Sequence, residues 1–278
     1  MRYKGKRILL TGGSGFIGKA LYTALTKEGA LVKRFEGDVR VYDQIKPEID
    51  HKLDYVFHFA APSSQVLFKR NIRYCVETTI NSFLQMAEFC SSNGVKLIYP
   101  STGVLSQGVE NEYARCKKVL EDIHLNSGLD ALGLRIFAGY GVGEGHKRDY
   151  ASVPYLFVLD VLNNRRPVIF GDGSQTRDFI YIDDLVQAIL VLAEECNQKI
   201  VDIGSGEKTS FNELIDYIGV ITEKRIIPEY IEAPKNYVKE THADITTMRR
   251  YNCEARTEIM EGIKKIVSFE KGNNNDND

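Results

Sequence analysis

The stretch that decides the fold lies near the start of the chain and reads Arg7-Ile8-Leu9-Leu10-Thr11-Gly12-Gly13-Ser14-Gly15-Phe16-Ile17-Gly18. It begins with an apolar run typical of a short buried strand, and the segment after it carries apolar side chains at helical spacing until Gly29. The glycines fit both G-x-G-x-x-G and G-x-x-G-x-x-G. In this order, strand, loop and helix let backbone N–H groups approach a pyrophosphate at the positive end of the helix. The stretch predicts a dinucleotide-binding turn; the alternative is a glycine-rich turn without a ligand.

The strand pattern at residues 30–36 ends where the ribose of a dinucleotide is expected. An acidic side chain about 20 positions after the glycines usually binds the adenosine ribose, and Glu36 and Asp38 both lie in this window. Arg34 lies close by and would instead favour a 2′-phosphate. The sequence therefore favours NAD and leaves NADP open.

Strand and helix patterns alternate through the first half of the chain. Strand patterns at 54–61, 95–100 and 132–137 alternate with helix patterns at 76–90 and 113–126. This alternation predicts an α/β protein with a doubly wound parallel sheet. We expect a dinucleotide-binding domain at 1–145 plus roughly 175–205, a smaller C-terminal α/β substrate-binding lobe at 146–174 and 206–272, and a disordered low-complexity tail at 273–278.

The composition excludes several function classes. The chain has 278 residues, 43% of them hydrophobic, and a formal net charge of −2, so it has length for a substantial core and no basic footprint for nucleic acid. We find no signal peptide and no apolar run of the ~20 residues that a membrane helix needs. The five cysteines are scattered, without metal-ligand spacing. We expect a soluble, cytoplasmic protein with reduced thiols, no metal and no nucleic-acid or membrane partner.

A Tyr-x-x-x-Lys pentad opens the helix pattern at 113–126. Residues four apart share a helical face, so the phenol of Tyr113 and the ammonium of Lys117 are expected to point the same way. A neighbouring cation and a helix N-terminus both lower the pKa of a phenol from about 10. Thr102 lies where the strand at 95–100 ends, so its hydroxyl is expected at the same substrate oxygen as Tyr113. The alternative for the pentad is an exposed tyrosine beside a solvated lysine.

One arginine in the second half of the chain is a candidate for anion binding. Arg177 lies in an alternating apolar pattern at 176–184 that suggests a strand, and an arginine fork suits a diphosphate. The alternative is a surface ion pair.

The ordered motifs together resemble an extended short-chain dehydrogenase/reductase of the NAD-dependent nucleotide-sugar epimerase/dehydratase family. The resemblance covers nearly all of the chain before the tail. It is carried by blocks at 11–18, 37–40, 58–61 (His58-Phe59-Ala60-Ala61), 101–102, 113 with 117, 171–185, 202–206 and 261–263.

The resemblance implies roles for individual residues. The cofactor would be bound by Gly12, Gly15, Phe16, Ile17 and Gly18 at the pyrophosphate, by Asp38 and Val39 beside the adenine, and by Phe59, Ala60, Ala61, Tyr113 and Lys117 along the groove. Thr102, Tyr113 and Lys117 would be catalytic, and Thr102, Tyr113 and Arg177 would bind the nucleotide-sugar substrate. Members of the family commonly form homodimers through a four-helix bundle, here the helices near 76–90 and 113–126.

The resemblance also implies a choice of reactions. A nucleotide-sugar 4-epimerase would act through a transient 4-keto sugar with bound NAD, and an NAD(P)H-dependent reductase would reduce a nucleotide 4-keto sugar. A non-catalytic dinucleotide-binding member is the third alternative. Dehydratases of the family have Asp-Glu after the catalytic Thr, where this chain has Gly103-Val104. The segment Tyr150-Ala151-Ser152-Val153 resembles hexosamine-type 4-epimerases, so we expect an epimerase.

Three departures from the family pattern affect these expectations. The segments 18–38 and 102–113 are shorter than usual, and Ala138 replaces an Asn that normally contacts the nucleotide diphosphate. We therefore expect an altered site opening and an atypical substrate.

Overall fold

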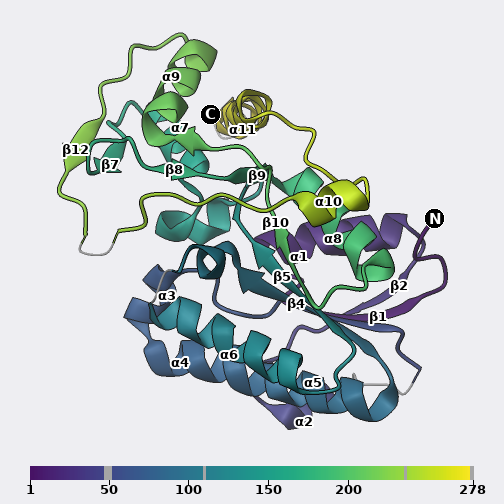
Figure 1. Ribbon diagram of the computed structural model, residues 1–278. Coiled ribbons are helices and arrows are strands. Elements are labelled where there is room, and N and C mark those ends of the chain that lie inside the picture. The colour runs from purple at the N-terminus through teal and green to yellow at the C-terminus, as the bar shows by residue number, and fades with distance from the viewer. Residues whose placement is uncertain (47–51, 109–110, 235–236, 276–278) are drawn as a thin grey trace. The chain divides into compact units, whose positions relative to one another are not determined.

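The computed structural model describes residues 1–46, 52–108, 111–234 and 237–275 (Figure 1). The chain divides into two compact units. The first comprises Met1–Ile136 and Val186–Asp202, and the second comprises Phe137–Leu185 and Ile203–Asp278. The corresponding boundaries expected from the sequence were 145, about 175 and about 205.

The first unit is built on a six-stranded sheet with the order β10-β5-β4-β3-β1-β2. The strands are β1 (Arg7–Thr11), β2 (Leu31–Arg34), β3 (Tyr55–His58), β4 (Lys96–Thr102), β5 (Ala131–Ile136) and β10 (Ile200–Ile203). Strands β1 to β5 pair in parallel. The chain places β2 on one side of β1 and then crosses to β3 on the other. This reversal is the switch point at which open α/β sheets bind ligands, and it confirms the predicted doubly wound Rossmann sheet.

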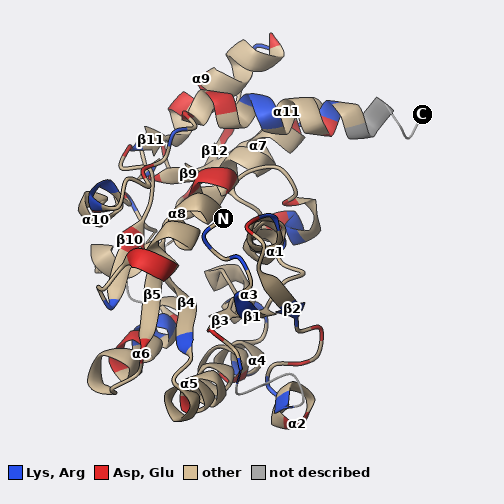
Figure 2. Cartoon of the chain, turned by 90° about the vertical axis from the view of Figure 1, so that its right-hand side faces the viewer, with Lys and Arg blue, Asp and Glu red and all other residues tan. Residues whose placement is uncertain are grey.

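Helices cover both faces of this sheet. The helices of the first unit are α1 (Phe16–Lys27), α2 (Tyr42–Ile45), α3 (Gln65–Arg70), α4 (Ile72–Val76), α5 (Ser82–Asn93) and α6 (Glu112–Asn126). Figures 1 and 2 show α4, α5 and α6 together on one face and α1 on the other. Because both faces are covered, the central strands are apolar throughout, and Ile8, Leu9 and Leu10 of β1 are fully buried.

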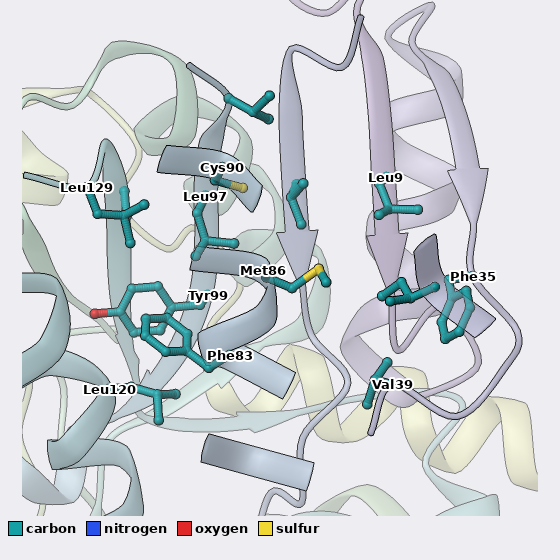
Figure 3. Close-up of a cluster of buried hydrophobic side chains, with 14 residues drawn as sticks. Leu9, Phe35, Val39, Phe83, Met86, Cys90, Leu97, Tyr99, Leu120 and Leu129 are labelled. Atoms are coloured by element: carbon teal, nitrogen blue, oxygen red, sulfur yellow. The ribbon is translucent and has the colours of Figure 1, made fainter. Parts of the chain in front are cut away.

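The core between the sheet and the helix layer of α5 and α6 is a single cluster. Phe83, Met86 and Cys90 of α5 point toward Leu97 and Tyr99 of β4 (Figure 3). The rings of Phe83 and Tyr99 meet edge to face with centroids 4.8 Å apart. Burying each such side chain stabilises the fold by ~1.5–3 kcal/mol, so this cluster anchors the helices that carry the site.

The helix predicted at 76–90 differs from the observed one by a π-helical turn. α4 ends at Val76, residues Glu77–Asn81 form a π turn and α5 begins at Ser82. The sequence pattern does not reveal this turn, because the apolar positions continue through it at helical spacing. The turn buries Thr78 and Thr79, and Ser82, the next residue of the helix, is buried against His58 at the end of β3.

The second unit combines short strand pairs with helices. Its strands are β6 (Ala138–Tyr140) paired with β9 (Phe179–Tyr181), β7 (Val168–Phe170) paired with β12 (Glu229–Ile231), and β8 (Thr176–Arg177) paired with β11 (Thr209–Ser210). Its helices are α7 (Val153–Leu162), α9 (Phe211–Thr222), α10 (Thr246–Arg250) and α11 (Ile259–Asn275), and α8 (Ile182–Glu195) continues into the first unit.

The C-terminal helix extends into the segment expected to be disordered. α11 runs to Asn275, so residues 273–275 continue a helix, and 276–278 lie outside the described residues. Low complexity suggested disorder, but Ile263, Ile266 and Val267 bury one face of α11 and the helix propagates from there.

Charged residues of both signs are interspersed over the described chain, as α11 illustrates (Figure 2). Among the described residues, none of the helices has the length and apolar character needed to cross a bilayer. All five cysteines are buried free thiols, as expected.

Candidate active site

The glycine loop after β1 is closed by backbone contacts. A Cβ on Gly18 would overlap the carbonyl group of Gly12, and one on Gly12 would lie 2.5 Å from the carbonyl carbon of Phe59. Gly12 also has φ of +72°, which favours glycine. The N–H of Gly15 donates to the Gly12 carbonyl at 3.0 Å. Side chains at residues 12 and 18 would therefore force the turn open.

The start of α1 fits an anion. Gly15 is the N-cap, and within the described part of the chain no side chain caps this helix and no acidic residue lies in its first turn, which Phe16 and Ile17 open. A Cβ on Gly15 would approach the Gly12 carbonyl oxygen at 3.3 Å and meet no other described atom within 4 Å. The positive end of the helix dipole and these uncapped N–H groups suit a pyrophosphate.

The two acidic residues expected near the ribose are each held by an arginine. Glu36 accepts a hydrogen bond from Nε of Arg34 at 3.0 Å, and its side chain is 69% exposed. Asp38 accepts from the backbone N–H of Arg40 at 2.9 Å and from its guanidinium. These bonds hold the pKa of Asp38 below its usual range. Glu36 is thus the more exposed of the two carboxylates, while both arginines are engaged.

The remaining residues expected along the cofactor groove lie on two segments. Phe59, Ala60 and Ala61 follow β3 and are half-buried, directly against the glycine loop. Val39 is 5% exposed and its side chain packs in the core cluster of Figure 3. Val39 could therefore contact an adenine only through its backbone.

A buried chain of hydrogen bonds runs beneath the glycine loop. Ser82 donates its hydroxyl proton to the Thr78 carbonyl, so it must accept from Nε2 of His58 at 2.9 Å. Nδ1 of His58 is then the acceptor for the hydroxyl of Thr11 at 2.8 Å, and Thr11 accepts from the N–H of Ala60 at 3.3 Å. The chain links β1, β3 and the π turn, and it fixes His58 as the neutral tautomer protonated on Nε2.

His58 makes the stability of the protein sensitive to acid. Burial lowers the pKa of His58 to about 3, so the unfolded chain takes up a proton near pH 6.5 that the folded protein excludes. Stability is therefore lost as pH falls through this window. Between pH 7 and pH 5 we expect the wild type to lose about 2 kcal/mol more unfolding free energy than His58→Gln, measured by urea unfolding. Equal pH slopes for the two proteins would contradict a buried neutral His58.

The catalytic candidates lie where α6 meets the end of β4. Tyr113 is in the first turn of α6, and its phenol lies near enough to the hydroxyl of Thr102, the last residue of β4, for that hydroxyl to lower its pKa. Lys117, one turn further on, donates from Nζ to the carbonyl oxygen of Pro100 at 2.8 Å. Thr102 and Lys117 are 4% and 2% exposed, and Tyr113 is half-buried. The structure thus brings the three side chains to one strand end.

The expected lowering of the Tyr113 pKa by Lys117 is wrong for this structure. Burial raises the pKa of the phenol because it removes water from the phenolate, and the nearby Thr102 hydroxyl opposes this only in part. Lys117 is directed to a backbone carbonyl instead. Burial also lowers the pKa of the Lys117 ammonium to about 8.

Helix α3 supports Tyr113 from the other side. Oε1 of Gln65 accepts from the backbone N–H of Tyr113 at 3.2 Å, and its amide donates to Glu112. The ring of Phe68 meets the Tyr113 ring edge to face, with centroids 5.8 Å apart. Asn111 caps α6 by accepting from the N–H of Ala114 at 2.9 Å. The start of α6 is therefore held by side chains as well as by the helix.

Arg177 lies in the second unit as a cation held by neutral groups. Its guanidinium donates to the carbonyls of Thr176 and Val238 at 2.7 Å each and lies 5.5 Å from the ring centroids of both Phe211 and Tyr237. Burial lowers its pKa. Among the described residues no carboxylate pairs with Arg177, so the surface ion pair considered from the sequence is absent there, and an anion would complete the site.

Three residues near the site were not singled out from the sequence. His58 was taken only as part of a motif, and Gln65 gives no signal because its contact with α6 crosses the fold. Glu121 had a signal: it follows Lys117 at the same four-residue spacing that joins Tyr113 to Lys117. As for metals, no group of three or more His, Cys, Asp or Glu in the described ranges is arranged to hold one.

A family model agrees with this geometry. The model described as the NAD dependent epimerase/dehydratase family matches residues 8–204. The chain belongs to this family. The match spans the glycine loop, the end of β4 and the Tyr-x-x-x-Lys helix, and it makes NAD the cofactor.

Individual relatives of this epimerase/dehydratase family member cover almost its whole length. A putative UDP-glucose 4-epimerase of Methanocaldococcus jannaschii is 28% identical, with 96% of this chain and 99% of the relative covered. A UDP-glucuronate 4-epimerase of Thermodesulfobacterium geofontis is 27% identical, with 95% and 96% covered. The crystal structure of UDP-glucose 4-epimerase with UDP-glucose from Thermotoga maritima is 26% identical, covers 96% and 99%, and has a TM-score of 0.88. Relatives named as decarboxylases of UDP-sugar acids match at 25% identity.

Proposed function

We propose that the protein is a nucleotide-sugar 4-epimerase that acts on a UDP-sugar through a transient 4-keto intermediate with bound NAD. The observation that carries this proposal is the approach of the Thr102 and Tyr113 hydroxyls beside buried Lys117, at the strand end next to the switch point. The names of the relatives that cover almost the whole chain support the 4-epimerase reaction and the UDP-sugar.

The residues present suit NAD, and each of them would carry out one part of the proposed reaction. When bound, NAD supplies a hydride acceptor that is reduced and reoxidised within one turnover. In its phenolate form Tyr113 takes the proton of the C4 hydroxyl while Thr102 hydrogen-bonds the same oxygen, and loss of the C4 hydride as well leaves a 4-keto sugar. After the sugar turns its other face, Tyr113 returns the proton. Lys117 binds the nicotinamide ribose, and Arg177 binds the substrate diphosphate.

The segment after Thr102 argues against elimination and decarboxylation. A 3₁₀ turn, Gly103–Gln107, follows β4, and none of its residues carries a carboxylate. Dehydration or decarboxylation that uses an acid or base in this segment would lack that group here. Proton transfer at one oxygen needs only the Thr102–Tyr113 pair.

The alternative function is reduction of a nucleotide 4-keto sugar by NAD(P)H. One observation favours it: burial raises the pKa of Tyr113, and a protonated phenol is the form that donates a proton to a ketone. Arg34 beside the ribose window leaves the phosphorylated cofactor open in this alternative.

Measuring how much cofactor is bound and how much is consumed distinguishes the two reactions. The purified protein is denatured and its nucleotide content is quantified, and the native protein is incubated with UDP-glucose or UDP-glucuronate. We expect about one NAD per chain and conversion to the C4 epimer without net NADH consumption. Stoichiometric oxidation of added NAD(P)H by a 4-keto sugar, with no epimerisation, would reverse the assignment.

We also propose that two copies pair through α5 and α6. Large apolar side chains are exposed on these helices, with Leu84, Val119 and Leu125 at 44%, 39% and 45% exposure. A second copy that presents the same helices would cover them in a four-helix bundle.

A charge on this helix face is expected to separate the pair. We expect the double variant Leu84→Glu/Val119→Glu to sediment as a monomer at concentrations where the wild type sediments as a dimer, because carboxylates would be buried in the interface. Val220→Glu on α9, where the side chain is 67% exposed, is the matched control and should leave the sedimentation unchanged. A wild type that is monomeric throughout would remove this proposal.

A further inference from the structure

Glu121 is a buried carboxylate on the helix that carries Tyr113 and Lys117. Its side chain is 1% exposed. It accepts two hydrogen bonds from Arg135, from Nε and Nη2 at 2.8 Å each, and a third from the hydroxyl of Ser101 at 2.6 Å. Two parallel N–H···O bonds from one guanidinium make a strong pair with a defined geometry.

The partners of Glu121 belong to adjacent strands at the end of the sheet. Ser101 on β4 and Arg135 on β5 are register partners, and the next residue of β4 is Thr102. Arg135 also lies 4.0 Å from the carboxylate of Asp202 on β10, which accepts from the hydroxyl of Ser106 in the turn after Thr102. The network therefore joins α6, three neighbouring strand ends and the turn that follows the catalytic threonine.

Three successive turns of α6 contact the last three residues of β4. The phenol of Tyr113 approaches the hydroxyl of Thr102, Lys117 donates to the carbonyl of Pro100, and Glu121 accepts from the hydroxyl of Ser101. In the proposed reaction the first two side chains also bind substrate and cofactor, so their contacts with β4 change during turnover. The contact of Glu121 is a buried ion pair that turnover does not exchange.

We propose that Glu121 is a positioning residue: its pair with Arg135 and its bond from Ser101 fix the register of α6 against the end of β4, and so hold Tyr113 at Thr102. The inference rests on the proposed roles of Thr102 and Tyr113. A displacement of about 1 Å between reacting groups can cost about 10²-fold in rate, so a register contact one turn from Lys117 is sufficient to control turnover.

The first test is Glu121→Gln, which places a neutral amide opposite the Arg135 guanidinium in place of the carboxylate. We expect kcat per folded molecule to fall at least about tenfold, with the NAD content and affinity within about twofold of wild type. Because the phenol moves away from the Thr102 hydroxyl that lowers its pKa, the rising limb of the pH–rate profile should move to higher pH. Asp54→Asn, which breaks the pair with Lys6 at the opposite ends of the strands, is the matched control and should not move it.

A second readout does not depend on the substrate. The chain has no tryptophan, so ionisation of its tyrosines can be followed by near-ultraviolet absorbance, and subtraction of Tyr113→Phe isolates Tyr113. We expect its titration to shift to higher pH in Glu121→Gln and, by less, in Ser101→Ala, which removes one hydroxyl and leaves the ion pair. If Glu121→Gln does not fold, Ser101→Ala and the volume-conserving pair Glu121→Gln/Arg135→Met carry the same measurement.

The outcomes separate this inference from the proposed function. If the wild type turns over no nucleotide sugar but the Tyr113 titration still shifts in Glu121→Gln, the proposed function is rejected and the positioning role is kept. Variants that lose stability while kcat per folded molecule, the pH profile and the Tyr113 titration all stay at wild-type values would reject the positioning role, since Glu121 would then be structural only.

Discussion

Tyr113→Phe is expected to reduce turnover by about 10²- to 10⁴-fold while leaving NAD bound. The substitution deletes one hydroxyl, the group proposed to exchange a proton with the substrate, and keeps the ring that packs against Phe68. The hydroxyl interacts with the side chain of Thr102, so its loss should change the unfolding free energy by about 1 kcal/mol or less. Turnover is measured with a UDP-sugar, and NAD content is measured after denaturation.

Thr102→Val provides the matched comparison for Tyr113→Phe. It removes the hydroxyl that approaches the phenol and keeps the shape of the side chain, so turnover should fall by less than in Tyr113→Phe. Turnover of Tyr113→Phe near the wild-type rate would exclude the phenol as the acid/base group. Loss of NAD from this variant would mean instead that the phenol serves the cofactor.

The fold was predictable because its determinants are local. The apolar run before Gly12, the glycine spacing and the alternating patterns each report a single element, and together they specify a parallel sheet with a switch point at β1 and β3. The π turn at Glu77–Asn81 was not predictable, because it changes the backbone without changing the apolar spacing.

Only those features of the candidate site that follow from the spacing of residues along the chain were predictable. The four-residue spacing placed Tyr113 and Lys117 on one face, and the strand end placed Thr102 beside them. The electrostatics were not predictable, because the pKa of Tyr113 depends on how deeply the phenol is buried and on where the Lys117 ammonium is directed. The chain of hydrogen bonds through His58 also escaped the sequence, since its members come from strands and helices far apart in the chain.

Gly18→Ala tests the proposed cofactor site by forcing open the glycine turn between β1 and α1. A methyl group at residue 18 would overlap the carbonyl of Gly12 and approach Gly13, and both obstacles are backbone atoms that cannot rotate away. We expect the unfolding free energy to fall by about 3 kcal/mol or more, because overpacking against backbone forces the start of α1 off β1.

Gly18→Ala should also bind NAD much more weakly, even where the variant is still folded. The N–H groups proposed to hold the pyrophosphate belong to the loop and first turn that the added methyl displaces, so we expect at least about 100-fold weaker NAD binding at a temperature below both unfolding transitions. Gly128→Ala is the matched control: a Cβ there meets no described atom within 4 Å, so its stability should stay within about 1 kcal/mol of wild type with NAD retained. If Gly18→Ala were folded and bound NAD as the wild type does, the dinucleotide would have to lie away from the β1–α1 turn, and the roles proposed for Tyr113 and Lys117 would lose their cofactor.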